Sequence, residues 1–99
     1  MTRRIAWAPR ATRDFLAAID WIEAEHPVNA QRVAKRVLDR VEGLASMATG
    51  RAGRVPGTYE VHVARTSLII AFELPDKQSI NILRLIHAKR NWLEGEWPE

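Results

Sequence analysis

A histidine and two basic residues lie close together near the C-terminal end of the chain, and their side chains could act on a phosphodiester. His87, Lys89 and Arg90 come directly after an apolar stretch. Histidine transfers protons near neutral pH, whereas lysine and arginine hold a phosphate and stabilise the charge that develops on it. With Glu60 as a base and Arg54 and Arg65 as phosphate contacts, this cluster would form a ribonuclease site. The alternative is that His87 is a hydrogen-bonded structural residue at the end of a strand.

Other common site chemistries have little support in the sequence. The three histidines, His26, His62 and His87, lie far apart and show no metal-ligand spacing. The chain has no cysteine, which excludes a thiolate nucleophile and a cysteine-ligated zinc. No serine lies in a nucleophile-elbow sequence, and no glycine-rich loop could surround a phosphate. We therefore expect neither a metal nor an organic cofactor.

The positive charge of the chain is carried almost entirely by arginine, with 12 Arg among the 15 basic residues. Arginine makes bidentate contacts to phosphate and carboxylate groups, so this bias favours an acidic or phosphate-bearing partner. An equally good explanation is a GC-rich genome, in which arginine replaces lysine throughout. Arg32, Arg36 and Arg40 form an i, i+4 row, which we interpret as a solvated helix face partly compensated by Asp39 and Glu42.

Four tryptophans are many for a chain of 99 residues. Trp7 and Trp21 fall within apolar patterns and are predicted to lie in the core. Trp92 and Trp97 lie in a polar C-terminal segment, where exposed aromatic side chains mark contact surfaces. The alternative is that both fold back on the edge of the sheet.

The length and hydropathy of the chain limit its organisation. The 99 residues suffice for one domain with a modest core, spanning residues 1–99. No apolar run approaches the length of a transmembrane helix, and the N-terminus lacks the apolar core of a signal peptide. We therefore expect a soluble, cytoplasmic protein that does not contact a membrane.

Apolar periodicity and turn residues predict two helices and four strands. The first helix ends before Pro27, because the residue that precedes a proline avoids helical geometry. Asn29 is the predicted N-cap of the second helix. The predicted elements are a strand at 3–7, helices at 9–25 and 29–48, a loop at 49–57, and strands at 58–64, 68–74 and 79–87.

The order β-α-α-β-β-β predicts an α+β fold. Its N-terminal helical hairpin would pack on one face of a mainly antiparallel, four-stranded sheet. The apolar strands 68–74 and 79–87 would be central and internal, and the short strand 3–7 would lie at an edge. Arg84 alternates with isoleucines, so we expect an internal ion pair with Glu60 or Glu73.

Three stretches of the chain have the residues of a known family. They read RVPGTYEV at 54–61, LIIAF at 68–72 and ILRLIHAKRNW at 82–92. The last has the pattern I-L-R, two hydrophobic residues, then H-x-x-R-x-W. Together with the order of the elements, these stretches resemble the RelE/ParE superfamily, formerly the plasmid-stabilisation family, whose members are toxins of bacterial type II toxin–antitoxin modules.

This superfamily has two branches with different targets. RelE-like members cut mRNA on the ribosome, and ParE-like members poison DNA gyrase. The nucleases commonly carry an arginine at the start of the third strand and a tyrosine near the C-terminus. Here the corresponding position is Ile69, and the single tyrosine, Tyr59, lies much earlier. The resemblance therefore favours a ParE-like gyrase inhibitor that arrests growth.

The ParE-like branch implies a partner and a contact surface, with no catalytic residue. The partner would be a ParD-like, DNA-binding antitoxin that neutralises the toxin in a hetero-oligomer. The residues implied for target binding are Arg84, His87, Lys89, Arg90 and Trp92. In the alternative, a ribosome-dependent mRNA endonuclease, the implied catalytic residues are Glu60, Arg65, His87 and Arg90. A third possibility is a degenerate member that binds only its antitoxin.

Overall fold

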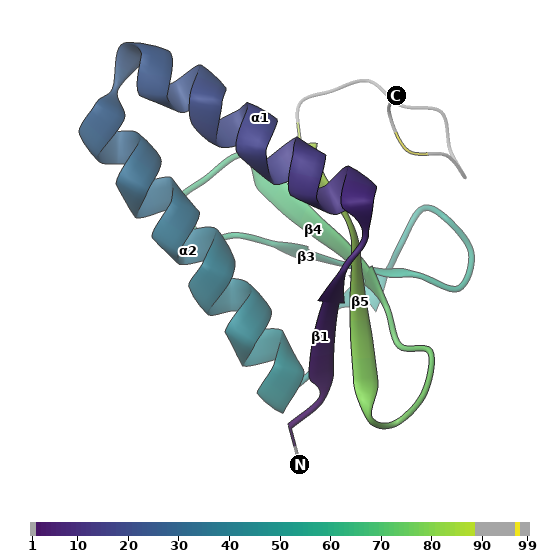
Figure 1. Ribbon diagram of the computed structural model, residues 1–99. Helices are drawn as coiled ribbons and strands as arrows, with labels where there is room; N and C mark the ends of the chain where they lie inside the picture. The colour runs from purple at the N-terminus through teal and green to yellow at the C-terminus, as the bar shows by residue number, and fades with distance from the viewer. Residues whose placement is uncertain (1, 89–96, 98–99) are drawn as a thin grey trace.

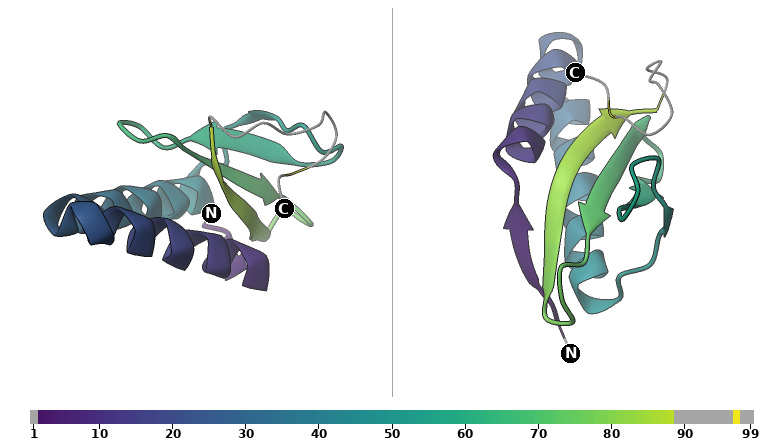
Figure 2. Two further views of the ribbon diagram at one scale, coloured as in Figure 1. Left: turned by 90° about the horizontal axis from the view of Figure 1, so that it is seen from above. Right: turned by 90° about the vertical axis from the view of Figure 1, so that its right-hand side faces the viewer.

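The fold consists of a helical hairpin packed against one face of a twisted sheet (Figures 1 and 2). The computed structural model describes residues 2–88 and residue 97. Neither helix in that part of the chain combines the length and apolar character needed to cross a membrane. The elements are β1 (Arg4–Trp7), α1 (Pro9–Glu25), α2 (Pro27–Ser46), β2 (Arg51–Ala52), β3 (Tyr59–His62), β4 (Leu68–Glu73) and β5 (Ser79–His87).

The sheet confirms the α+β prediction but differs from it in two respects. It has five strands in the order β1-β5-β4-β3-β2, because the segment predicted as a loop contributes the two-residue strand β2. It is also mixed, since β1 pairs with β5 in parallel whereas the other neighbours are antiparallel. The predicted edge position of β1, internal position of β5 and central position of β4 are confirmed.

The helices match their predicted periods, and the boundary between them lies earlier than expected. Helix α2 begins at Pro27 rather than after Asn29, and the N-cap His26 makes no side-chain capping hydrogen bond. Proline suits the first helical position, because its ring presets the helical φ and that position needs no N–H donor. The backbone N–H of His26 also donates to the carbonyl of Ile22, so one residue joins the two helices.

The core lies between α2 and the sheet. The buried stripe of α2 has the helical spacing predicted from the sequence and includes Val37 and Leu44. It packs in one cluster with Ile70, Phe72 and Ile82 of β4 and β5. Helix α1 packs on the same side of the sheet, near the β1 edge. There the rings of Trp7 and Phe15 lie with their centroids 5.7 Å apart.

The tip of the helical hairpin extends past the end of the sheet (Figure 1). The overhang explains one wrong prediction, because Trp21 is 72% exposed instead of lying in the core. Trp7 and Trp97 are half-buried, and Trp92 lies outside the described residues.

Candidate functional site

A groove of about 760 Å³ opens between the overhanging hairpin and the end of the sheet. Its α1 wall carries Ala18, Trp21 and Ile22, and its sheet wall carries Leu68 and Leu85. The lining is therefore largely apolar, although the groove is open to solvent. Concave apolar surfaces with a few polar groups are the usual form of a binding site.

The sheet wall of the groove exists because β1 is shorter than its neighbour. Strand β1 pairs with β5 only as far as Trp7 opposite Ile82, and the N–H of Ala8 donates to the Ile82 carbonyl. Beyond that point β5 continues without a strand beside it on this edge. The side chain of Asp14, from α1, takes the place of the strand: its Oδ2 accepts the Leu85 N–H at 3.1 Å.

Asp14 also forms an ion pair with Arg84. The Nε of Arg84 donates to Asp14 Oδ2 at 2.7 Å, and the other carboxylate oxygen lies 3.5 Å from an Arg84 terminal nitrogen. The Nε of Arg10 also lies 3.4 Å from Oδ1 of Asp14. The prediction of an internal ion pair is confirmed, but the predicted partners were wrong.

Those predicted partners are occupied elsewhere. Glu73 accepts a hydrogen bond from Asn81. Glu60 is 2% exposed, and its Oε2 accepts the backbone N–H of Arg54 at 2.8 Å. Its other oxygen lies 3.9 Å from Arg51. Glu60 was expected on an exposed strand face, but the loop before β3 covers that face.

The structure brings together some of the predicted site residues. Arg65 and His87, from the nuclease set, both line the groove, whereas Glu60 is not among its lining residues. Arg84 and His87, from the target-binding set, line it as well. The remaining members of both sets, Lys89, Arg90 and Trp92, lie outside the described residues.

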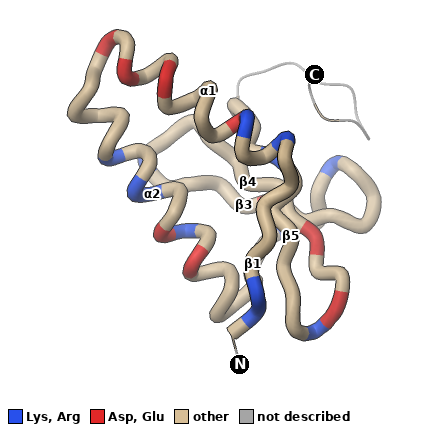
Figure 3. Tube along the Cα trace, in the orientation of Figure 1, with Lys and Arg blue, Asp and Glu red and all other residues tan. Residues whose placement is uncertain are grey.

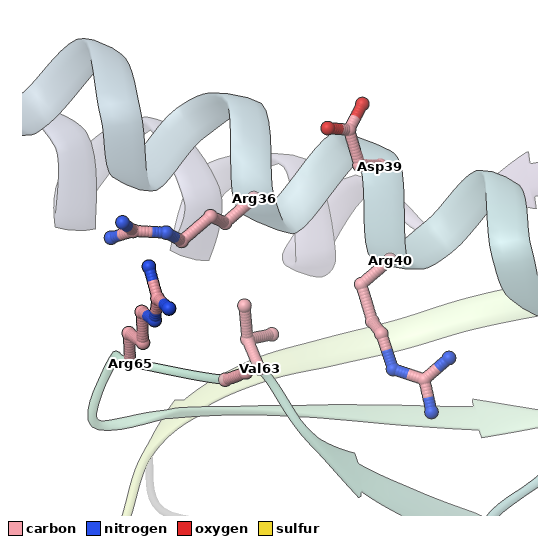
Figure 4. Close-up of a pocket in the computed structure, with 6 residues that line it drawn as sticks. Arg36, Asp39, Arg40, Val63 and Arg65 are labelled. Atoms are coloured by element: carbon pink, nitrogen blue, oxygen red, sulfur yellow. The ribbon is translucent and has the colours of Figure 1, made fainter.

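A second, smaller cleft of about 350 Å³ adjoins the groove through Arg65, which lines both (Figure 4). Its other charged lining residues are Arg36, Arg40 and Asp39 of α2, and Val63 forms part of its floor. The predicted arginine row is therefore not simply a solvated helix face, since Arg36 and Arg40 are half-buried at this cleft. The i, i+4 spacing of the arginines was the only sign of this cleft in the sequence. The sequence does not show that a turn places Arg65 opposite α2.

The expected compensation by Asp39 does not occur. Asp39 Oδ2 accepts a hydrogen bond from Lys35 at 2.7 Å, and its carboxylate points away from Arg36 and Arg40 (Figure 4). The acidic positions of α1 gather mainly in its second half, and α2 carries several basic positions (Figure 3).

The described residues contain no group of three or more His, Cys, Asp or Glu side chains that could hold a metal ion. The Asp14–Arg84 ion pair supports the wall of the groove, and Arg65 lines both the groove and the smaller cleft.

Comparison with known proteins identifies relatives of the chain. A family model described as "ParE toxin of type II toxin-antitoxin system, parDE" matches residues 5–92. A protein of Sinorhizobium fredii (strain NBRC 101917 / NGR234), described as "Putative toxin Y4kP", is 34% identical over 91 residues, which are 91% of this chain and 93% of that protein.

A solved structure shares the fold. A chain from the structure titled "Chromosomal ParDE TA system from P. aeruginosa" superposes with a TM-score of 0.81 at 23% identity. The match covers 89% of this chain and 98% of that one. At this level of identity, the likeness is evidence for the architecture alone.

Proposed function

Because the chain belongs to the ParE toxin family of type II toxin–antitoxin systems, we propose that it inhibits DNA gyrase and that a cognate antitoxin neutralises it. The antitoxin is a ParD-like, DNA-binding protein, one segment of which occupies the groove. The proposal assigns the toxin and both partners to the cytoplasm. The family match over residues 5–92 supports gyrase as the target. The groove supports the proposed position of the antitoxin.

Three features of the groove suit a segment that folds as it binds. It is largely apolar, it is open to solvent, and it presents the exposed side chain of Trp21. An amphipathic segment buries such a surface by placing side chains at helical or strand spacing into it. Large aromatic side chains at the centre of a contact are the usual source of binding energy.

Gyrase is favoured over mRNA because the nuclease residues lack suitable environments. Ile69 is buried in β4 at the position where the resemblance to nucleases calls for an arginine. Tyr59, the single tyrosine, stacks on Phe72 with ring centroids 5.6 Å apart. Glu60 is held by the backbone of Arg54, which fits a structural role better than a general base. For target binding we propose His87, Lys89, Arg90 and Trp92. Arg84, the fifth residue of the expected set, is 8% exposed and paired with Asp14, so we propose that it supports the wall of the groove instead.

A supercoiling assay with purified gyrase tests the target. The toxin is expected to block supercoiling or to trap cleaved DNA, and antitoxin added first should prevent both effects. Primer extension on translated mRNA provides the comparison, and it should show no new ends. Normal supercoiling at toxin excess would contradict inhibition of gyrase. If mRNA were also cut at the ribosomal A site, the protein would be a RelE-like endonuclease.

Substitutions on α1 test the antitoxin site. Trp21→Ala should weaken antitoxin binding by about tenfold or more, which corresponds to about 1.4 kcal/mol. Leu16→Ala is the matched control, because Leu16 is also exposed on α1 but does not line the groove. Equal affinities for the two variants in isothermal titration calorimetry would place the antitoxin elsewhere.

A further inference from the structure

Three arginines from two separate elements surround the smaller cleft. Arg36 and Arg40 project from successive turns of α2, and Arg65 comes from the turn between β3 and β4. The guanidinium groups of Arg36 and Arg65 point toward one another across the cleft (Figure 4). Such convergence of like charges is unfavourable unless an anion lies between them.

The positive charge of the cleft is uncompensated within the described part of the chain. None of the ion pairs found there includes Arg36, Arg40 or Arg65. Asp39, the acidic residue at the rim, is engaged by Lys35. Arg36 and Arg40 are also half-buried, which reduces their hydration and strengthens their attraction for an anion.

The backbone holds Arg65 in an unusual conformation. Its φ is +63°, in the left-handed region that glycine and asparagine adopt more readily than arginine. The turn around it is well fixed, because Thr66 Oγ1 donates to the Val63 carbonyl at 2.8 Å and accepts the Leu68 N–H at 3.0 Å. The turn therefore fixes the backbone position from which the Arg65 side chain extends toward Arg36 of α2 (Figure 4).

The surroundings of the cleft favour a carboxylate of a protein over a nucleic-acid phosphate. Nucleic acids are held by cations spread along the phosphate backbone. Here the guanidinium groups of Arg36 and Arg65 face one small hollow with Val63 in its floor, whereas that of Arg40 points away from them toward Gly43; Arg65 also lines the apolar groove (Figure 4). A ligand that fills both has apolar side chains with an acidic residue beside them.

From this arrangement we infer that the cleft between Arg36 and Arg65 binds an aspartate or glutamate side chain of the antitoxin segment that lies in the groove. This inference rests on the proposed neutralisation by an antitoxin and specifies its chemistry. Arginine forms two parallel hydrogen bonds with a carboxylate, so the contact selects antitoxins by the position of one acidic residue.

The test uses the purified toxin and the antitoxin encoded by the adjacent open reading frame. Arg36→Gln and Arg65→Gln should each raise the dissociation constant by about tenfold, and the loss should shrink as salt is added. Arg32→Gln is the control, because Arg32 lies one turn earlier on α2 and does not line the cleft. Circular dichroism verifies that each variant is folded.

A double-mutant cycle identifies the carboxylate. Each Asp or Glu of the antitoxin segment is changed to Asn or Gln, and one such change should cost little once Arg65 is already Gln. Unchanged affinities in Arg36→Gln and Arg65→Gln, with wild-type binding intact, would overturn this inference alone. If the wild-type proteins form no complex, the neutralisation proposal falls and this inference with it. Loss of duplex DNA binding in the two variants, with antitoxin binding intact, would assign the cleft to nucleic acid instead.

Discussion

The Nε of Arg84 donates a 2.7 Å hydrogen bond to Oδ2 of Asp14, and this ion pair joins two elements whose contacting residues lie 70 positions apart. Both side chains are largely withdrawn from solvent, with 9% of Arg84 and 13% of Asp14 exposed. The same carboxylate accepts the Leu85 N–H where β1 has ended. Asp14 thus fixes α1 against the wall of the groove.

Asp14→Ala should therefore destabilise the fold by about 3 kcal/mol, because it leaves Arg84 as a mostly buried charge without its partner and also removes the acceptor for Leu85. Urea denaturation followed by circular dichroism measures this loss. Asp14→Asn keeps an acceptor oxygen but removes the charge. Its free energy of unfolding should lie between those of Asp14→Ala and the wild type.

Asp39→Ala is the matched control for this ion pair. The Lys35–Asp39 contact has the same 2.7 Å separation, but 75% and 64% of the two side chains are exposed. Exposed pairs contribute little, so the change should cost less than about 0.5 kcal/mol. Similar losses for Asp14→Ala and Asp39→Ala would show that burial does not set the strength of the Asp14–Arg84 pair.

Glu60 is predicted to be a structural residue, so its removal should affect stability. Glu60→Ala leaves the Arg54 N–H without its acceptor, which should cost about 1–3 kcal/mol of unfolding free energy. Glu60→Gln retains an acceptor and should cost less. Thermal and urea unfolding test both variants, with Glu42→Gln on exposed helix surface as control. A Glu60→Gln protein of wild-type stability that no longer arrests growth would contradict this view.

Two glycine substitutions should change stability in opposite directions. A Cβ at Gly43 would meet nothing closer than an Arg40 nitrogen at 3.8 Å, so Gly43→Ala should stabilise α2 by about 0.5–1 kcal/mol through helix propensity. A Cβ at Gly53 would collide with Thr58 Oγ1 and lie 3.1 Å from the Thr58 carbonyl carbon. Gly53→Ala should therefore cost about 1–3 kcal/mol. Denaturant midpoints of the two variants on the same side of the wild type would refute this contrast.

The predictable parts of the fold are those whose signal is local in the sequence. The apolar stripe of α2 and the turn before β5 follow from spacing and from residue type within a few positions. The parallel pairing of β1 with β5 and the Asp14–Arg84 ion pair join distant segments, and nothing in either segment specifies the other. Alternation along β3 assigned Glu60 to the correct face, but it could not reveal that a loop covers that face.

The candidate site was predictable in its residue types more than in its geometry. Arg65 and His87 were selected from the sequence by their chemistry and Arg84 by the family resemblance, and all three line the groove. Arg36 was interpreted as part of a solvated row, because helix periodicity describes one element at a time. The cleft arises only where a turn with a left-handed residue meets α2, and that meeting is a property of the tertiary fold.

Asp76, in the turn between β4 and β5, is predicted to make stability depend on pH in acid. Its Oδ1 accepts the Gln78 N–H at 2.7 Å, and this hydrogen bond is the main reason that the pKa of Asp76 lies below its ordinary value of 3.8. A depressed pKa in the folded state means that the stabilising contribution is complete above the unfolded value. The contribution is lost as the pH falls through the folded pKa.

Asp76→Asn isolates this effect, because the amide oxygen can still accept the Gln78 N–H but does not titrate. The wild type should be more stable than the variant near neutral pH, and the difference should shrink below pH 3.8, where the unfolded state binds the proton first. Side-chain carboxyl chemical shifts measured by NMR give the folded pKa directly. A midpoint at or above 3.8, or a stability difference that grows in acid, would contradict the role of the Gln78 hydrogen bond.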